Sequence, residues 1–201
     1  MIASLTAEKL TCIRGERVLF AGLSFRVMAG QALAVEGANG AGKTSLLRLI
    51  GGFLSPRAGR LLLKTAEGES EDSEERGQSI GWFGHQDGLK PQLTVAEQLL
   101  FFAKLYRAPE GSEGVLEEVG LSRQKDFPCR YLSAGQKRRL ALARLMVSKR
   151  PLWLLDEPFA ALDTDGQALI ARQMLRHCGD GGIIIAATHD KLGLGNASIR
   201  L

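Results

Sequence analysis

Hydrophobic residues gather in short runs along the chain, and turn residues bound each run. Four of these runs read "QALAVEG", "SIGWFG", "PLWLLDEP" and "GGIIIAATH". Because a strand buried on both faces needs near-continuous apolar residues, the four runs predict a mostly parallel core sheet. Alternating apolar and polar residues over 2–28, together with "GRLLLKT" at 59–65, predict a smaller antiparallel sheet. The pattern as a whole predicts an α/β fold.

The stretch between Gln86 and Leu132 changes to helical periodicity. Segment 93–106 opens with Thr94 and Glu97 at capping-box spacing, and segment 112–121 predicts a shorter helix that closes near Gly120. We therefore expect a helical subdomain, about residues 87–147, inserted in the α/β core of a single domain that spans residues 1–201.

Composition agrees with one such domain. The chain has 201 residues, of which 45% are hydrophobic and 24% charged, which is enough for a full core. No apolar run approaches the ~20 residues that span a bilayer, and the first residues lack a signal-peptide pattern, so we expect a cytoplasmic protein. Cys12, Cys129 and Cys178 are widely spaced and form no CxxC pair, which predicts reduced structural thiols.

The net charge of +4 conceals an asymmetry. Residues 67–76, "EGESEDSEER", carry six acids and one base, so the rest of the chain carries +9. This acidic segment predicts a solvated hairpin loop or a short disordered insert without chemistry of its own. The surplus of positive charge could serve nucleic acid, anionic lipid or a nucleotide.

A phosphate-binding motif follows the first predicted core strand. The motif GxxxxGK[ST] is matched, before a helical segment that starts near Ser45, by Gly37, Ala38, Asn39, Gly40, Ala41, Gly42, Lys43 and Thr44. Glycines let backbone N–H groups converge on phosphate, Lys43 neutralises the β and γ phosphates, and the Thr44 hydroxyl can bind Mg²⁺. The alternative is a plain glycine-rich turn.

Polar residues stand at the carboxyl ends of other predicted core strands. Asp156 suits a second metal-side ligand, and Glu157 is placed to orient or deprotonate an attacking water. His189 ends one strand, and Gln86 follows another by two residues. Adjacent acids can also cap a helix, and a lone His or Gln is usually a loop residue. Their shared position at one sheet edge favours a ligand site, because open α/β sheets bind ligands there.

A second anion-binding helix start lies at 132–136. Its residues are Leu132, Ser133, Ala134, Gly135 and Gln136. Ser133 is placed to cap the helix, and the small residues after it leave the N–H groups accessible to phosphate. We interpret the basic run Lys137, Arg138 and Arg139 as a solvated helix face rather than as ligand contacts. The opposite face, buried in this interpretation, carries Leu142, Leu145 and Met146.

The order and spacing of these motifs, with "ALD" at 161–163, resemble the nucleotide-binding subunits of ABC transporters over nearly the whole chain. The resemblance implies ATP and Mg²⁺ as cofactors, with Thr44, Gln86 and Asp156 on the metal side. Gln86 would also contact a membrane partner, Asp163 would be the D-loop residue, and His189 the γ-phosphate switch. In this family, the P-loop of one subunit and the signature of another enclose one ATP. The resemblance therefore implies a homodimer in which residues 132–136 act in trans.

Within the family, the small size of the chain and the residues of its motifs resemble those of the ATPase subunits of bacterial cytochrome c maturation systems. That resemblance implies integral membrane partners of CcmB, CcmC and CcmD type at the cytoplasmic face of the inner membrane, and no nucleic-acid partner. ATP hydrolysis would drive haem export or release of a haem-loaded chaperone. The alternatives are a soluble ABC-type ATPase that acts on nucleic acid or ribosomes, and a P-loop kinase, which would leave "LSAGQ" unexplained.

Arg14 is a departure from the family pattern. It occupies the position, counted back from the P-loop, where many ABC subunits place an aromatic residue against adenine. Its planar guanidinium could stack on the purine in the same way. The alternative is an exposed arginine in the turn "CIRGERV".

Overall fold

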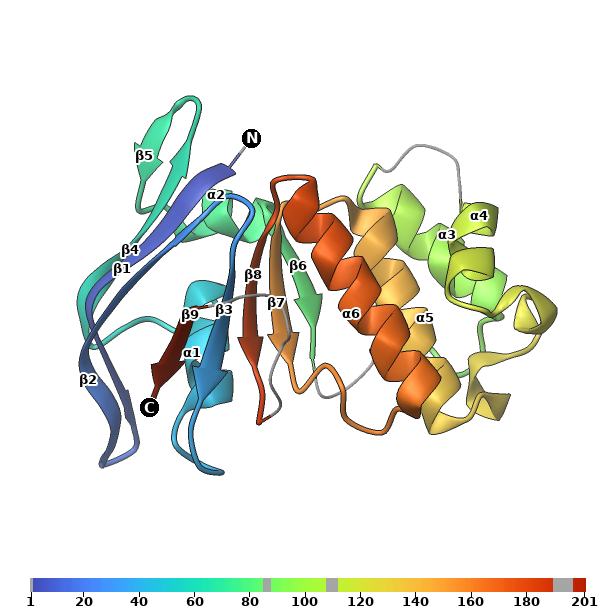
Figure 1. Cartoon of the computed structure of the whole chain (residues 1–201), viewed down its shortest axis with the longest axis horizontal. Helices are drawn as coiled ribbons and strands as arrows, with labels where there is room; N and C mark the ends of the chain where they lie inside the picture. Colours follow the sequence, from blue (N-terminus) through green and yellow to red (C-terminus); the bar gives the residue numbers. More distant parts are fainter. Residues whose placement is uncertain (1, 85–87, 108–111, 190–196) are drawn as a thin grey trace.

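Two β-sheets and flanking helices are arranged in layers (Figure 1). The computed structural model describes residues 2–84, 88–107, 112–189 and 197–201. The antiparallel sheet and the helix of residues 43–50 lie on one side of the parallel sheet, while the other long helices lie on the opposite side, together with the helical subdomain. The predicted α/β class, with a parallel core and a separate antiparallel sheet, is confirmed.

The parallel sheet has the order β6-β7-β8-β3-β9. Its strands are β3 (Ala32–Glu36), β6 (Ile80–Phe83), β7 (Leu152–Asp156), β8 (Ile183–Ala187) and β9 (Ala197–Arg200). Every residue of β7 and β8 is buried, as expected for strands with both faces covered. The short edge strand β9, three of whose four residues are exposed, was not predicted.

The antiparallel sheet has the order β2-β1-β4-β5. Its strands are β1 (Ile2–Arg14), β2 (Arg17–Met28), β4 (Ala58–Thr65) and β5 (Gly68–Ser70). The β1–β2 turn contains Gly15 with a φ of 59°, a conformation that glycine adopts without steric cost. Strands β1, β2 and β4 match the prediction.

The helices are α1 (Lys43–Ile50), α2 (Ser73–Gln78), α3 (Val95–Leu105), α4 (Ser112–Glu118), α5 (Ala134–Ser148) and α6 (Thr164–Gly179), with 3₁₀ turns at Ser122–Gln124 and Cys129–Tyr131. Four helices, α1, α3, α4 and α5, correspond to predicted helical segments, whereas α2 and α6 were not predicted. The predicted capping box of Thr94 and Glu97 is present in α3. Within the described ranges, no helix is both long and apolar enough to cross a membrane.

The hydrophobic core has two parts, because successive side chains of each core strand point to opposite faces of the parallel sheet. Leu152 and Leu154 of β7 pack with α1 and the antiparallel sheet, whereas Trp153 and Leu155 pack with α5 and α6. The parallel sheet is therefore anchored on both faces, which holds the carboxyl ends of its strands in fixed positions.

The acidic segment 67–76 is mostly exposed and begins as a hairpin, in agreement with the first of its two predicted forms, and it also contains a short helix that was not predicted. It forms β5, which pairs with β4 as a hairpin, and most of α2, which Asp72 caps by accepting a bond from the Glu74 N–H. Arg76 is buried and donates from Nε to the Ile50 carbonyl at 2.8 Å. Burial lowers the pKa of its guanidinium. The segment is ordered because its one base is anchored to the end of α1.

Candidate nucleotide-binding and hydrolysis site

The loop between β3 and α1 has the geometry of a phosphate cradle. Gly40 and Gly42 have φ values of 78° and 113°, which are left-handed conformations that side chains disfavour. Gly42 is also the N-cap of α1, so the helix N-terminus, with its partial positive charge, faces this loop. The Lys43 ammonium lies back across the loop and donates to the Gly37 carbonyl at 2.8 Å. The start of α1 and one buried cation thus lie at the same loop.

Thr44 and Asp156 lie together although 112 positions separate them in the sequence. The Thr44 hydroxyl is 3.1 and 3.0 Å from the two carboxylate oxygens of Asp156, which ends β7 and is 6% exposed. Hydroxyl and carboxylate oxygens are the hard ligands that Mg²⁺ prefers, and this ion commonly uses one or two carboxylates plus substrate phosphates. These two residues therefore fit the ion that the sequence implies.

Glu157 and His189 lie at the same edge of the sheet. The His189 Nε2 atom is 2.9 Å from the Lys43 ammonium, 3.0 Å from the Asn39 side-chain oxygen and 3.5 Å from a Glu157 carboxylate oxygen. An unprotonated Nε2 would accept from Lys43, whereas a protonated Nε2 would donate to Asn39 or Glu157. His189 is thus placed to exchange partners between the phosphate loop and the carboxylate.

The phosphate loop, Asp156 and Glu157 line one cleft of about 420 Å³, and Gly37, Ala41 and His189 are not among its lining residues. The predicted residues that line it are Ala38, Asn39, Gly40, Gly42, Lys43, Thr44, Ser45, Asp156 and Glu157. Leu19 of β2 also lines the cleft, and a Cβ atom on Gly42 would lie 3.1 Å from the Leu19 Cβ atom. Leu19 was not predicted, because nothing in the alternation of β2 indicates that the antiparallel sheet reaches the loop.

The second predicted phosphate site is a separate helix start. Ser133 caps α5 by accepting from the Gln136 N–H at 3.2 Å, and the Gln136 side chain accepts from the Ser133 N–H at 2.9 Å. Ser133 and Ala134 are exposed, and residues 132–136 do not line the 420 Å³ cleft. Figure 1 shows α5 and α1 on opposite sides of the parallel sheet. Within one chain, the two predicted sites therefore stay apart.

Arg138 corrects the interpretation of the basic run as a solvated face. It is 5% exposed, and its guanidinium carbon lies 4.1 Å from the centre of the Phe83 ring. Lys137 and Arg139 are half-buried. The helical spacing could have predicted this burial. Arg138 precedes the buried Ala141, Leu142 and Leu145 by three, four and seven positions, so it shares their face of the helix.

Three further predicted residues lie outside the described lining of the cleft or outside the described part of the chain. Asp163 caps α6, and the bond from the Gly166 N–H lowers the pKa of its carboxyl, with Arg139 adding to the effect. Arg14 is exposed at the end of β1, opposite Arg17, and does not line the cleft. Gln86 lies outside the described residues, so its predicted metal and partner contacts stay predictions.

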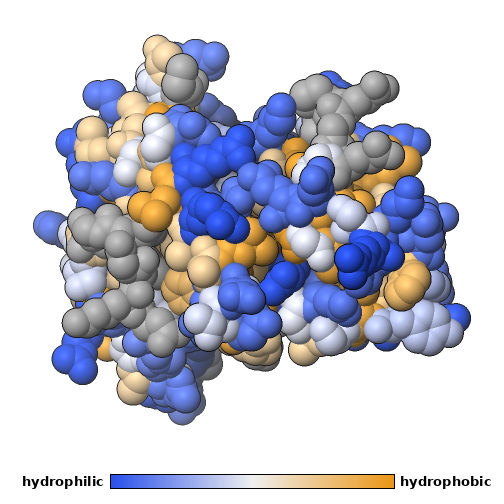
Figure 2. Space-filling view, turned by 45° about the vertical axis from the view of Figure 1, so that its right-hand side comes forward, coloured by the Kyte–Doolittle hydropathy of each residue, from blue (hydrophilic) through white to orange (hydrophobic). Residues whose placement is uncertain are grey.

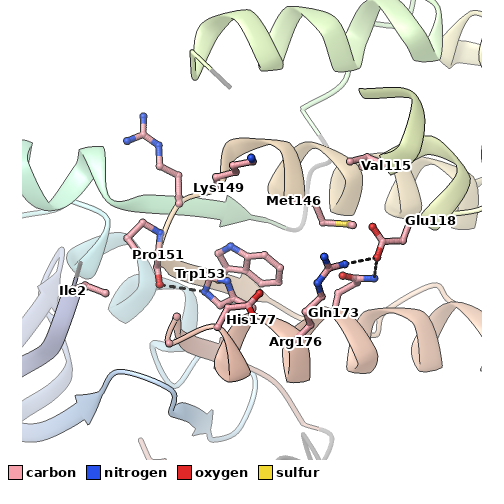
Figure 3. A pocket seen from close by; sticks show the side chains of 14 residues that line it. Ile2, Val115, Glu118, Met146, Lys149, Pro151, Trp153, Gln173, Arg176 and His177 are labelled. Carbon is pink, nitrogen blue, oxygen red and sulfur yellow. Dashed lines mark hydrogen bonds and ion pairs between the residues drawn. The ribbon is translucent and has the colours of Figure 1, made fainter. Parts of the chain in front are cut away.

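A different cavity of about 430 Å³ lies at the opposite, amino-terminal edge of the sheet (Figure 3). Trp153 stacks on His177 there with 3.9 Å between ring centres, and His177 pairs with the Pro151 carbonyl at 3.2 Å. Burial lowers the pKa of His177. No described residue of the predicted site lines this cavity.

The fold and the cleft define a P-loop ATPase, and the comparisons identify its class. The family model described as "ABC transporter" matches residues 20–160. The chain therefore belongs to the ABC transporter family, as one of its ATP-hydrolysing, ATP-binding subunits.

Sequence similarity to curated proteins identifies a smaller group within the ABC transporter family. The chain is 46% identical to "Cytochrome c biogenesis ATP-binding export protein CcmA" of Rhodopseudomonas palustris strain BisB5, over 98% of this chain and 97% of that protein. It is 45% identical to the protein of the same name from Bradyrhizobium diazoefficiens, with the same coverage. The chain thus resembles CcmA along its full length.

Solved structures agree on the fold. A putative ABC transporter ATP-binding protein from Pyrococcus furiosus superposes with a TM-score of 0.85 and 22% identity, over 99% of this chain and 98% of that one. The cbiO1 protein from Clostridium perfringens, part of the ABC transporter complex cbiONQ, superposes with a TM-score of 0.77 and 28% identity. That match covers 94% of this chain and 80% of the cbiO1 chain.

Proposed function

We propose that this chain is the ATP-hydrolysing subunit of a membrane ABC complex for c-type cytochrome biogenesis. The observation that carries the proposal is that Lys43, the Thr44–Asp156 pair and Glu157 line one cleft, with His189 in contact with Lys43 and Glu157. A cation that binds phosphate, oxygen ligands for a metal ion and a group that orients the attacking water are recurring parts of phosphoryl-transfer sites.

Each group has a role in the proposed hydrolysis. Lys43 and the N–H groups of the loop bind the β and γ phosphates. Thr44, Asp156 and Gln86 would hold the metal ion. The Mg²⁺ ion supplies charge neutralisation when bound. Glu157 orients or deprotonates the attacking water, and His189 contacts the γ-phosphate. The exposed start of α5 would complete the site of a second copy of the chain, with the Asp163 loops alongside in a nucleotide-sandwich homodimer.

The biological role rests on the similar proteins. Their names assign an ATP-binding export protein to cytochrome c biogenesis, and their match covers almost the whole chain. In this proposal, hydrolysis drives haem export or the release of a haem-loaded chaperone. The partners are integral membrane subunits of CcmB, CcmC and CcmD type, and the chain is a peripheral protein at the cytoplasmic face of the bacterial inner membrane.

The surface of α3 supports a membrane partner. Leu100, Phe101 and Leu105 are 46%, 40% and 59% exposed, although they are large apolar residues on one short helix. Figure 2 shows hydrophobic surface between the hydrophilic residues on the helical side of the molecule. Exposed apolar surface of this kind commonly marks an interface. It lies within residues 87–106, which follow Gln86, where the membrane partner is expected to bind.

The catalytic part of the proposal is tested with Glu157→Gln. This variant should abolish turnover and still bind ATP, because the binding groups lie in the phosphate loop, and it should accumulate as a closed dimer. The assay compares phosphate release, ATP binding and oligomeric state with those of Glu117→Gln, the same change at an exposed position of α4. Unchanged hydrolysis in Glu157→Gln would remove Glu157 from the mechanism.

The partner is tested by crosslinking in native membranes. Photo-crosslinkers placed in turn at Leu100 and Leu105 should capture integral membrane proteins, and the complex should co-purify from detergent-solubilised membranes. A crosslinker at exposed Arg172 of α6 is the control. Capture of only soluble proteins or nucleic acid from α3 would contradict the transporter role and favour a soluble ABC ATPase.

A further inference from the structure

Arg138 joins three parts of the site through buried contacts. Its Nη1 donates to the Gly84 carbonyl and its Nη2 to the Glu157 carbonyl, each at 2.6 Å. Gly84 follows β6, at the start of the segment that leads to Gln86, and the guanidinium lies over the Phe83 ring. Burying a cation is costly unless hydrogen bonds compensate it, so this arrangement constrains all three partners.

Glu157 has a backbone conformation that needs such a constraint. Its φ is 48°, in the left-handed region that side chains other than glycine rarely adopt. A residue of this kind persists only where its surroundings determine its conformation. The Glu157 N–H donates to the Ala187 carbonyl at 2.8 Å, and Arg138 holds the Glu157 carbonyl. The peptide groups on both sides of the Glu157 side chain are therefore held by partners outside β7.

The helix that carries Arg138 also carries the signature. Arg138 lies five positions after the Ser133 cap, which is about 7.5 Å along an α-helix. A displacement of the exposed start of α5 by a bound phosphate would therefore move the guanidinium that holds Glu157. In the proposed dimer, that phosphate belongs to the ATP of the partner subunit.

We propose that Arg138 is a positioning residue for Glu157 of its own chain. Through α5, it couples the signature, which contacts the partner's nucleotide, to the carboxylate that activates water in its own site. This inference rests on the proposed function, because it needs both Glu157 as the water-activating group and the signature acting in trans.

The first test separates positioning from binding. Arg138→Met keeps the length of the side chain and removes its donors, and Arg138→Lys keeps the charge. We expect kcat to fall by tenfold or more in Arg138→Met, because misplacing a reacting group by about 1 Å can cost about 100-fold. KM and the Kd for ATP should change by less than about threefold, since binding depends on the phosphate loop. Arg138→Lys should recover part of kcat.

Arg172→Met is the matched control, because it removes an exposed arginine from the helix α6. Thermal unfolding shows whether each variant is folded. If Arg138→Met does not fold, the kinetics of Arg138→Lys are used in its place. A wild-type kcat in Arg138→Met, or in Arg138→Lys when that is the folded variant, would overturn the inference. An equal loss of kcat and ATP affinity would also overturn it.

The second test uses mixed dimers, purified through two different tags. In one dimer, a single chain carries both Arg138→Met and Glu157→Gln, and its partner is wild type. In the other, one chain carries Arg138→Met and its partner carries Glu157→Gln. If Arg138 acts on its own Glu157, the first dimer should match a wild-type/Glu157→Gln dimer, and the second should be at least tenfold slower.

The reverse order would show that Arg138 acts only on the partner's site, and equal rates would show no such coupling; either result overturns the inference. A separate measurement distinguishes failure of the proposed function from failure of this inference. If Glu157→Gln homodimers hydrolyse ATP at the wild-type rate, the role of Glu157 is wrong. If they are inactive while Arg138→Met is fully active, only the role of Arg138 is wrong.

Discussion

Replacing Thr44 with Val tests the contact that joins the phosphate loop to β7. Valine has the shape of threonine without the hydroxyl, so the packing around α1 should be retained. The Asp156 carboxylate is 6% exposed and accepts from Thr44 at 3.0 Å, so it would lose this donor. Leaving a buried acceptor without its donor costs about 1–3 kcal/mol. For a chain of this size, about 2–4 °C per kcal/mol predicts a Tm lower by about 2–12 °C.

The same variant should lose the effect of Mg²⁺. The hydroxyl is a proposed metal ligand, so added Mg²⁺ should raise ATP affinity and turnover in wild type and much less in Thr44→Val. ATP binding with EDTA should be similar in both proteins. Thr44→Ser, which keeps the hydroxyl, is the control and should respond to Mg²⁺ like wild type. An unchanged Tm would refute the structural reasoning, and an unchanged response to Mg²⁺ would refute the metal site.

Lys43→Ala should raise the Kd for ATP by about tenfold to more than 100-fold, because a lost charge-assisted bond costs about 1.5–3 kcal/mol; equal affinity by titration would contradict the P-loop assignment. Arg14→Ala should weaken ATP and GTP binding equally, by about 1 kcal/mol, if the guanidinium stacks on the base; unchanged affinities would identify an exposed turn arginine.

Burial lowers the pKa of His177 below its usual 6.5, so the folded state favours the neutral ring. The resulting stability is present above pH 6.5 and is lost as the pH falls below it. Urea unfolding between about pH 5 and 7 should therefore be less pH-dependent in His177→Gln than in wild type; parallel curves would contradict this.

Most of the fold could be predicted because its determinants are local. Near-continuous apolar runs identified four core strands, and the cap residues Thr94 and Ser133 identified the starts of α3 and α5. The short edge strand β9 was missed, because exposed four-residue segments carry little hydrophobic signal. In the acidic segment 67–76 the solvated hairpin could be predicted, but helix α2 and the burial of Arg76 could not, because composition does not indicate the single contact of Arg76 with α1.

The sequence by itself determined the motifs of the proposed site: a phosphate loop, two acids after a buried strand and a second helix start. The spacing of residue types along the chain specifies them, because each depends on one turn or one strand end. Only the tertiary structure decided what these groups contact. It placed Leu19 in the cleft and Arg138 in the core, where it holds the Glu157 carbonyl at 2.6 Å. Those contacts join segments that are distant in the sequence, so they depend on how the sheets and helices pack.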